Sequence, residues 1–246
     1  MALQVYIIQL LVQEEVMQFK MKETNNRKVI IPGEVIAKGD EFLPGEGTEK
    51  IGDEIIALRY GLSEESNNLV KVIPLSGVYQ PRRGNVVIGN VENVTFNGWV
   101  IDIGASENAF LSLAEVPRFV SKDAIEDVMK IGDLTVAKIW NMNKRGIDLS
   151  IKSRGLGRID DGLIVQVNPN KVPRIIGKEG SMIKIIKNKT GCDITVGQNG
   201  FIWIKGDKVE DEIFAKKAIN FVVEKSYLSG LTEEIEKWFV KNEGKE

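Results

Sequence analysis

The hydrophobic pattern of this chain changes its period once, near Arg154, and this change limits the possible folds more than any other feature. Before Arg154, apolar residues form short runs separated by glycine, proline and asparagine, as in small β domains. After it, apolar residues at helical spacing alternate with short strand-like runs. The 246 residues are enough for two to three small domains. We therefore predict a multi-domain protein, mainly β in its first part and α+β in its second.

Residues 25–80 predict a small N-terminal β domain. Short apolar runs rich in β-branched residues alternate there with turn signals such as Pro32-Gly33 and Gly39-Asp40. Residues 1–24 precede this domain, and their apolar run Val5–Val12 is too short to span a membrane. This extension is either poorly ordered or a helix that packs on a partner. The predicted strands are Val29–Ile31, Val35–Ile36, Ile55–Leu58 and Leu69–Ile73.

Residues 81–152 predict a five-stranded barrel of the OB-fold type. Pro81–Asn85 has the composition of a linker, and a long connection follows the third of five strand candidates. Five strands in about 70 residues with such a crossover are the plan of an OB barrel. The candidates are Val86–Val94, Gly98–Ile103, Ala109–Leu113, Leu134–Trp140 and Gly146–Ile151.

Residues 153–226 predict an α+β domain with the element order βααββα. Ser181–Thr190 carries isoleucines on one side and lysines on the other, and Gly191 suits the end of this helix. Asn199-Gly200 is typical of a tight hairpin turn between two strands. The elements are Leu163–Val167, Val172–Ile176, Ser181–Thr190, Asp193–Val196, Phe201–Ile204 and a long helix from about Lys208 to Glu224.

Residues 227–246 predict a C-terminal helix and tail. Ile235, Trp238 and Phe239 share one face of that helix. The face docks either on its own domain or on a partner, and we favour its own domain because most such apolar stripes are used in that way.

The most informative motif is Gly177-Lys178-Glu179-Gly180, which separates the two short predicted helices of the βααββα domain. Two glycines let the backbone approach a phosphate chain, and the following helix offers free N–H groups and the positive end of its dipole. These features are typical of KH domains, in which such a loop holds about four nucleotides of single-stranded RNA. The alternative is a structural glycine turn beside a solvated lysine face. The surrounding cations are Lys171, Arg174, Lys184, Lys187 and Lys189.

Charge and rare residues narrow the function further. The net charge is −2, yet Lys and Arg outnumber Asp and Glu by 13 to 9 between Arg154 and Lys225. The predicted KH domain is therefore the electropositive part of the chain. There is no histidine and one cysteine, Cys192, which removes the usual general acid/base, zinc sites built on these residues and internal disulfides. We predict no catalytic residue, no metal and no cofactor, in a reducing, cytoplasmic setting.

The predicted barrel carries further candidates for RNA contacts. Phe96 and Trp99 flank the Asn97-Gly98 turn, and each either stacks on a base or supports the barrel. Lys144 and Arg145 suit phosphate contacts.

Five other residues of this region have less specific signals. Phe110 and Trp140 are also candidates for base stacking, but we favour a role in filling the barrel or supporting its loops. Lys138 is a further candidate for a phosphate contact. Arg82 and Arg83 either keep the linker soluble or lie on an RNA path.

Three blocks of residues resemble a known family, the cap subunits of the archaeal RNA exosome that carry N-terminal, S1-type OB and KH domains. The chain departs from the family pattern at Ser112, where a histidine is common, and at Asn85, where an aspartate often follows the glycine. The first block is Val29–Val35, and the second is Gly84–Val94 with Gly98–Ile103. The third is Val172–Met182 together with Gly191-Cys192 and Asn199–Trp203.

The resemblance implies a non-catalytic subunit that binds single-stranded RNA. Three such caps sit on a hexameric ring of phosphorolytic subunits, bind A-rich 3′ tails and lead them to the ring pore for 3′-to-5′ degradation. The N-terminal domain is the main contact with the ring in this family. By that analogy, Pro32, Gly33 and Glu34 lie at the partner interface.

Two other functions remain open at this point. A free-standing RNA chaperone or translation regulator would use the same two RNA-binding folds. A nuclease acting by itself would need a carboxylate cluster for metal ions or a histidine. The sequence shows no such constellation and no phosphate-binding Walker motif.

Overall fold

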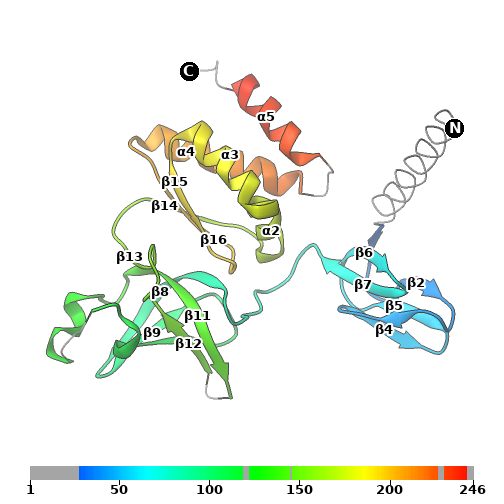
Figure 1. The fold of residues 1–246 in the computed structure, drawn as a ribbon, viewed down its shortest axis with the longest axis horizontal. Helices are drawn as coiled ribbons and strands as arrows, with labels where there is room; N and C mark the ends of the chain where they lie inside the picture. Colours follow the sequence, from blue (N-terminus) through cyan, green and yellow to red (C-terminus); the bar gives the residue numbers. More distant parts are fainter. Residues whose placement is uncertain (1–27, 119–121, 145, 227–229, 243–246) are drawn as a thin grey trace, which may run out of the picture. The chain divides into compact units, whose positions relative to one another are not determined.

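The computed structural model describes residues 28–118, 122–144, 146–226 and 230–242 (Figure 1). The chain forms two compact units, Met1–Ser76 and Gly77–Glu246. The predictions for the extension 1–24 and for Arg145 fall outside the described residues.

The first unit contains two small sheets. One has the strand order β1-β6-β7-β3, in which β3 joins β7 in parallel, and the other has the order β2-β5-β4. A buried cluster of Ile30, Ala57 and Val72 links β1, β5 and β7. The predicted β character is confirmed, and three further strands appear that the sequence pattern missed (β3, β4 and β6). The bounds are β1 (Val29–Ile30), β2 (Val35–Lys38), β3 (Leu43–Pro44), β4 (Thr48–Ile51), β5 (Glu54–Ala57), β6 (Gly61–Ser66) and β7 (Leu69–Pro74).

The second unit begins with the predicted barrel. Its strands follow the order β12-β10-β9-β8-β11-β13, and an additional pairing of β12 with β11 closes the ring of five. The parallel pairing of β10 with β12 is the one non-antiparallel contact among these described strands. The OB-type barrel is therefore confirmed. The bounds are β8 (Val86–Thr95), β9 (Gly98–Asp102), β10 (Ala109–Ser112), β11 (Leu134–Asn143), β12 (Gly146–Ser150) and β13 (Gly157–Ile159).

The long crossover of the barrel lies between β10 and β11, as predicted. It contains two 3₁₀ segments, η1 (Leu113–Glu115) and η2 (Lys122–Asp127). Met129, at the end of the crossover, is fully buried in the barrel core together with alternate residues of the strands. The crossover therefore covers an end of the apolar core that the short strands leave open.

The βααββα domain is confirmed as well. Its antiparallel sheet has the order β14-β16-β15, and helices cover one face of it (Figure 1). The apolar sides of α3 and α4 meet the sheet in one buried cluster that includes Ile186, Ile202 and Ile219. The bounds are β14 (Leu163–Gln166), η3 (Pro169–Lys171), α2 (Val172–Ile176), η4 (Lys178–Gly180), α3 (Ser181–Thr190), β15 (Asp193–Val196), β16 (Phe201–Lys205) and α4 (Val209–Glu224).

The C-terminal helix α5 (Leu231–Asn242) docks on this domain. Trp238 stacks on Phe214 of α4 with ring centroids 5.5 Å apart, and Phe221 lies 5.7 Å from the same indole. Ile235 and Phe239 are fully buried, which confirms that the apolar stripe serves its own domain. None of the helices in the described residues has the length and apolar character needed to cross a bilayer.

The hairpin turn between β15 and β16 joins the α+β domain to the barrel. The Asn199 side chain accepts a hydrogen bond from the Ile88 N–H and donates to the carbonyl oxygens of Ile88 and Ile103, at 3.2, 2.7 and 2.9 Å. Gln198 exchanges two further hydrogen bonds with the backbone of Val86. Among the described residues, β9 pairs with β8 only from Asn90 onward. The backbone groups of Val86 and Ile88, near the start of β8, therefore bond to the turn instead of to β9.

Candidate nucleic-acid interface

The loop between α2 and α3 is built on two glycines with different roles. Gly177 has φ 74° and ψ 173°, a conformation that is essentially restricted to glycine. A Cβ at this position would lie 2.7 Å from the backbone nitrogen and the Cβ of Met182. Gly177 therefore permits the close approach of the loop to the first turn of α3.

Gly180 has φ 77° and directly precedes α3. A Cβ there would meet no atom nearer than 3.8 Å, so the space around this glycine is open toward solvent. No side chain caps the start of α3. The Ser181 N–H donates to the Lys178 carbonyl oxygen, so the N–H groups that follow it in the first turn are the ones available to an anion such as a phosphate oxygen.

The two remaining loop residues lie between the glycines, and two of the predicted cations lie on the helices on either side of the loop. Lys178 and Glu179 are exposed, and Glu179 has φ 53°, which is unusual for a residue with a side chain. Lys184 is exposed on α3, and its Cε lies 3.8 Å from the position of a Cβ at Gly180. Arg174 is half-buried on α2, the helix before the loop. Both cations thus come from the helices that flank the loop.

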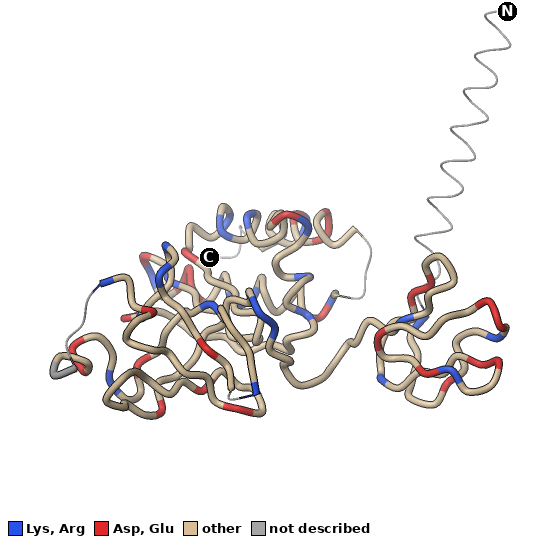
Figure 2. Tube along the Cα trace, turned by 60° about the horizontal axis from the view of Figure 1, so that its bottom comes forward, with Lys and Arg blue, Asp and Glu red and all other residues tan. Residues whose placement is uncertain are grey.

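Lys171 is placed differently from the other predicted cations. Its amine donates a hydrogen bond of 3.2 Å to the carbonyl oxygen of Val223, near the C-terminal end of α4. A cation at this end of a helix compensates the negative end of the dipole. Its amine therefore already serves the fold, and an RNA contact would need this hydrogen bond to break. Elsewhere, acidic and basic residues are interspersed along the trace (Figure 2).

The prediction that Trp99 offers a stacking surface to a base is wrong. Its side chain is 0% exposed, and its indole N–H donates to the carbonyl oxygen of Met129 at 2.9 Å. The residues of β9 alternate across the sheet, so Trp99 points into the barrel while Val100 points outward. Phe96, in the β8–β9 turn, is 74% exposed, and its role in stacking stays a prediction.

Of the two structural roles expected for Trp140, the structure contradicts the first, because the side chain does not fill the barrel. It is 43% exposed on β11, whereas the preceding residue, Ile139, is fully buried. Phe110 is half-buried on β10, opposite Val100 and Asp148 of the neighbouring strands. The sequence contained a signal for the exposure of Trp140, since it alternates with the apolar Ile139, but the bulge described below was not visible in it.

The basic residues near the end of β11 are exposed. Lys138 lies on the strand and Lys144 in the turn after it. Beside them, Asn141 and Asn143 both donate to one carboxylate oxygen of Asp148, at 2.9 and 3.4 Å. These amides hold the Asp148 carboxylate in a hydrogen-bonded position on the neighbouring strand.

The predicted partner residues Pro32, Gly33 and Glu34 form the turn between β1 and β2. Gly33 has φ 87° and donates its N–H to the Ala57 carbonyl at 2.7 Å. Glu34 accepts hydrogen bonds from the Lys28 amine and the Ile31 N–H, and the Lys28 contact holds the pKa of this carboxyl below its usual value. Hydrogen bonds therefore hold this turn in an exposed position of the first unit.

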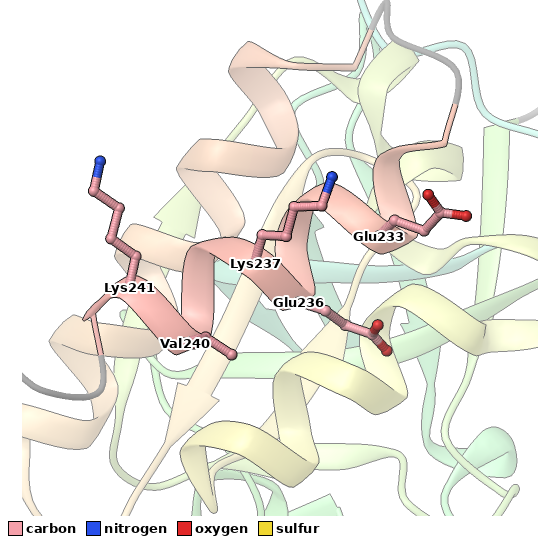
Figure 3. A pocket seen from close by; sticks show the side chains of 5 residues that line it. All are labelled: Glu233, Glu236, Lys237, Val240 and Lys241. Carbon is pink, nitrogen blue, oxygen red and sulfur yellow. The ribbon is translucent and has the colours of Figure 1, made fainter.

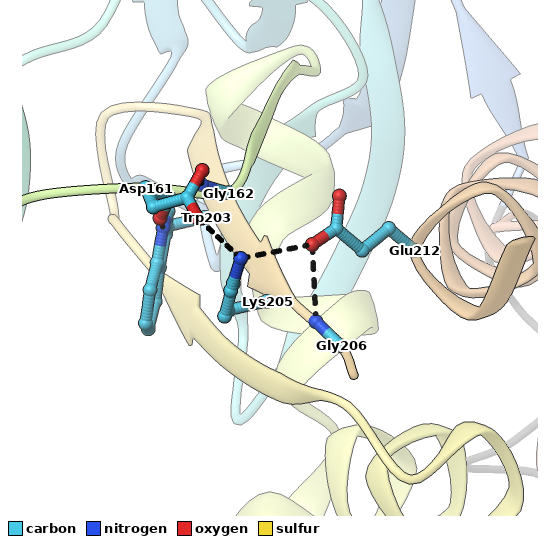
Figure 4. A network of polar contacts seen from close by, with 6 residues as sticks. All are labelled: Asp161, Gly162, Trp203, Lys205, Gly206 and Glu212. Atoms are coloured by element: carbon cyan, nitrogen blue, oxygen red, sulfur yellow. Dashed lines mark hydrogen bonds and ion pairs between the residues drawn. The ribbon is translucent and has the colours of Figure 1, made fainter. Parts of the chain in front are cut away.

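Two acidic residues that could have been metal ligands, Asp161 and Glu212, instead contact Lys205. Lys205 pairs with Asp161 at 2.5 Å and lies 3.9 Å from Glu212, while the indole of Trp203 donates to the Asp161 backbone (Figure 4). The hydrogen bond from Lys205 lowers the pKa of Asp161, and the same pair raises the pKa of Lys205. Among the described residues, no group of three or more acidic or cysteine side chains is arranged to hold a metal ion.

A surface depression of about 520 Å³ lies along α5 (Figure 3). It is lined by Glu233, Glu236, Lys237, Val240 and Lys241, so acidic and basic groups balance one another. The depression contains none of the predicted RNA-binding residues.

The two folded parts of the second unit define a class of protein. A barrel of the S1 type followed by a KH domain with an open glycine loop is the architecture of a multi-domain RNA-binding protein. Family models agree with this class: the S1 domain described for RRP4 matches residues 78–122, and the KH domain matches residues 162–210.

Relatives define the particular family. The exosome complex component Rrp4 of Methanothermobacter thermautotrophicus is 39% identical over 214 residues, which are 86% of this chain and 67% of that protein. The Rrp4 component of Nitrosopumilus maritimus is 38% identical over 221 residues, covering 88% and 97% of the two chains. A crystal structure described as that of an exosome complex RNA-binding protein matches with TM-score 0.60 and 36% identity, over 67% of this chain and 97% of that one. The chain belongs to the family of the exosome complex component Rrp4.

Proposed function

We propose that this chain is a cap subunit that binds single-stranded RNA and leads its 3′ end to the pore of a phosphorolytic exosome ring. The observation that carries the proposal is the open Gly177–Gly180 loop in a chain that belongs to the Rrp4 family. The loop combines an uncapped helix start, an open glycine and exposed lysines, which together suit a phosphate backbone.

The chain is proposed to have no catalytic residue of its own. The absence of histidine removes the usual general acid/base. The Asp161 carboxylate is paired with Lys205, and Glu212 accepts a hydrogen bond from the Gly206 N–H. RNA cleavage would then be the work of the ring subunits, with the preference for A-rich 3′ tails as a property of the assembled cap.

The first unit is proposed to contact the ring. Large exposed apolar side chains flank the Pro32–Glu34 turn: Val29, Ile31 and Val35 are 50%, 59% and 37% exposed. Apolar side chains gathered at one exposed turn are typical of a surface that a partner covers. The site residues Pro32, Gly33 and Glu34 stand at the centre of this group.

Two measurements on the full chain test the proposal. The purified chain is incubated with labelled single-stranded RNA, phosphate and Mg²⁺, first alone and then with ring subunits. We expect bound but intact RNA in the first case, and co-elution with the ring together with 3′-to-5′ shortening in the second. An RNA in which the 3′ tail is not A-rich serves as the competitor that measures tail preference.

The outcomes separate the alternatives. RNA binding without any co-elution with the ring would favour a free-standing RNA chaperone or translation regulator. Shortening of RNA in proportion to the amount of chain, with no ring present, would establish a nuclease and refute the proposal. Family membership favours the cap over both.

A further inference from the structure

Trp140 occupies an unusual position in the barrel. Strand β11 pairs with β12 through Ile139 opposite Leu149 and through Asn141 opposite Asp148, so Trp140 is the extra residue of a β-bulge. A bulge redirects the side chain of its extra residue, and bulges are over-represented near binding sites. The bulge leaves a large aromatic ring 43% exposed in the middle of a strand.

A segment that contains the exposed Arg83 pairs with the other edge of β11. Gly84 donates its N–H to the Ile139 carbonyl at 2.7 Å, and Ile139 donates to the Asn85 carbonyl at 2.8 Å. Further along, Lys138 pairs with Val86 of β8, and the two strands lie side by side in Figure 1. The exposed Arg83 directly precedes Gly84, in a turn that the Asn85 N–H closes by donating to the Arg82 carbonyl. Arg83 therefore lies one residue from the contact of this segment with Ile139, the neighbour of Trp140 in β11.

The charges on β11 and on the segment before β8 have one sign, and the Asp148 carboxylate of the neighbouring β12 is held by the amides of Asn141 and Asn143. The segments Gly77–Val91 and Leu134–Lys144 contain Arg82, Arg83, Lys138 and Lys144 but no aspartate or glutamate, although the whole chain has a net charge of −2. Arg83, Lys138 and Lys144 form no ion pair with any residue that the structure describes. Other exposed cations of the same unit, such as Lys152 and Arg158, are paired with carboxylates.

We propose that Arg83, Lys138 and Trp140 form a second contact surface for single-stranded RNA, here called the β11 strip. This proposal deepens the proposed function and rests on it. The indole stacks on a base, and the two cations bind the phosphates on either side of that base. The strip extends over roughly 20 Å as far as Lys144, if about 3.3 Å is taken for each strand residue.

Single-stranded nucleic acid fits the strip better than an acidic peptide does. It offers flat π-faces and regularly spaced negative charges together, which matches an exposed indole flanked by cations. The strip also lies on β11 and the segment before β8, away from the outward residues of β9 and β10. It therefore lengthens the RNA path of the chain beyond the KH loop.

The test measures RNA affinity of the full chain by fluorescence anisotropy for two substitutions and a control. Trp140→Ala is expected to weaken binding by roughly fivefold to a hundredfold, the range found for one stacked base, whereas Trp140→Phe retains most of the affinity. Lys138→Ala is expected to lower the slope of log affinity against log salt by about 0.7. The control replaces two exposed lysines of α4, Lys216→Ala with Lys217→Ala, and is expected to leave affinity and slope near those of the unchanged chain.

An abasic oligonucleotide separates stacking from charge. It keeps the phosphates and removes the bases, so the effect of Trp140→Ala should disappear while that of Lys138→Ala persists. Wild-type affinity of a folded Trp140→Ala variant would overturn the β11 strip, and so would a loss of ring co-elution with unchanged RNA affinity, which would identify a protein contact. If either result were obtained, weaker RNA binding by the KH-loop variant Gly180→Asp would still support the proposed function. A chain that binds no RNA at all would refute both proposals.

Discussion

At the scale of single residues, the two loop glycines differ in what they tolerate. Gly177 has backbone and side-chain atoms of Met182 at 2.7 Å from any added Cβ, so its substitution disturbs the start of α3 itself. Gly180 has open space, and its left-handed backbone is one that Asn and Asp adopt more readily than other residues with side chains. Gly180 is therefore the position at which RNA binding can be tested without damage to the fold.

Gly180→Asp is expected to weaken binding of single-stranded RNA by roughly tenfold, about 1.4 kcal/mol, because it adds a negative charge where phosphates approach. Gly180→Asn is the matched control, since it has nearly the same shape and no charge. The measurement is anisotropy at several salt concentrations, beside circular dichroism to verify folding. Equal affinities of the Asp and Asn variants would contradict a phosphate contact at this loop.

Tyr79 provides a prediction about pH. Burial raises the pKa of Tyr79 from 10.0 to about 12, and its hydroxyl donates to the Asn85 side chain at 2.9 Å. The folded-state pKa lies above the unfolded value. The contribution of the neutral phenol to the free energy of unfolding is therefore fully present below pH 10. This contribution is lost as the pH rises from 10 toward 12.

The ionisation of Tyr79 is measured as the difference in ultraviolet absorbance between the wild type and Tyr79→Phe during an alkaline titration. We expect a step near pH 12 in the folded chain and near pH 10 in urea. The stability of Tyr79→Phe should also depend less on pH between these two values. A step near pH 10 in the folded chain would show that the phenol is not held in a buried site.

At the scale of elements, the turn between β15 and β16 couples two domains. Asn199 is 4% exposed, and its side chain makes three hydrogen bonds to backbone groups of the barrel. Its removal would leave buried N–H and C=O groups without partners, which costs more than the loss of an exposed hydrogen bond. The turn therefore contributes stability across the junction and not within the KH domain alone.

Asn199→Ala is expected to destabilise the chain by roughly 2 to 5 kcal/mol, since each unsatisfied buried group costs about 1 to 3 kcal/mol. Asn188→Ala, at an exposed position of α3, is the control and should stay within about 0.5 kcal/mol of the wild type. Urea denaturation followed by tryptophan fluorescence measures both. A loss of stability no larger for Asn199→Ala than for Asn188→Ala would mean that the turn contributes little to the junction.

At the scale of the whole molecule, the exposed apolar turn of the first unit makes a prediction about assembly. Ile31→Asp is expected to weaken co-elution with the ring by at least tenfold, about 1.4 kcal/mol, because it places a charge in a surface that the ring would cover. Ile131→Asp is the matched control: the residue type is the same and the exposure similar, 65% against 59%, but it lies on the barrel. Both variants should bind RNA as the wild type does.

The comparison of these two variants decides where the ring contact lies. Equal co-elution of Ile31→Asp and the wild type would move the contact away from the Pro32–Glu34 turn. Weaker co-elution of Ile131→Asp alone would place it on the barrel.

Local patterns in the sequence were enough to predict the elements of the barrel and of the α+β domain, whereas β3, β4 and β6 of the first unit were missed. Helix α3 was predicted with the bounds Ser181–Thr190 that the structure has, because isoleucines and lysines repeat at helical spacing and Gly191 ends the run. The five barrel strands and the long crossover followed from short apolar runs and turn residues. The Gly177–Gly180 loop was also readable, since a glycine pair between two helices is a local pattern. All of these features depend on residues that are neighbours in the chain.

Which side chains are exposed to a ligand could be learned only from the packing of the folded chain. A shift of one residue turns every side chain of a strand to the other face, so Trp99 lies inside the barrel while Trp140, at a bulge, lies outside. The amine of Lys171 bonds to Val223, 52 residues away, and Asn199 bonds to Ile88, 111 residues away. Such contacts depend on how distant segments pack, and no local pattern of residues encodes that packing.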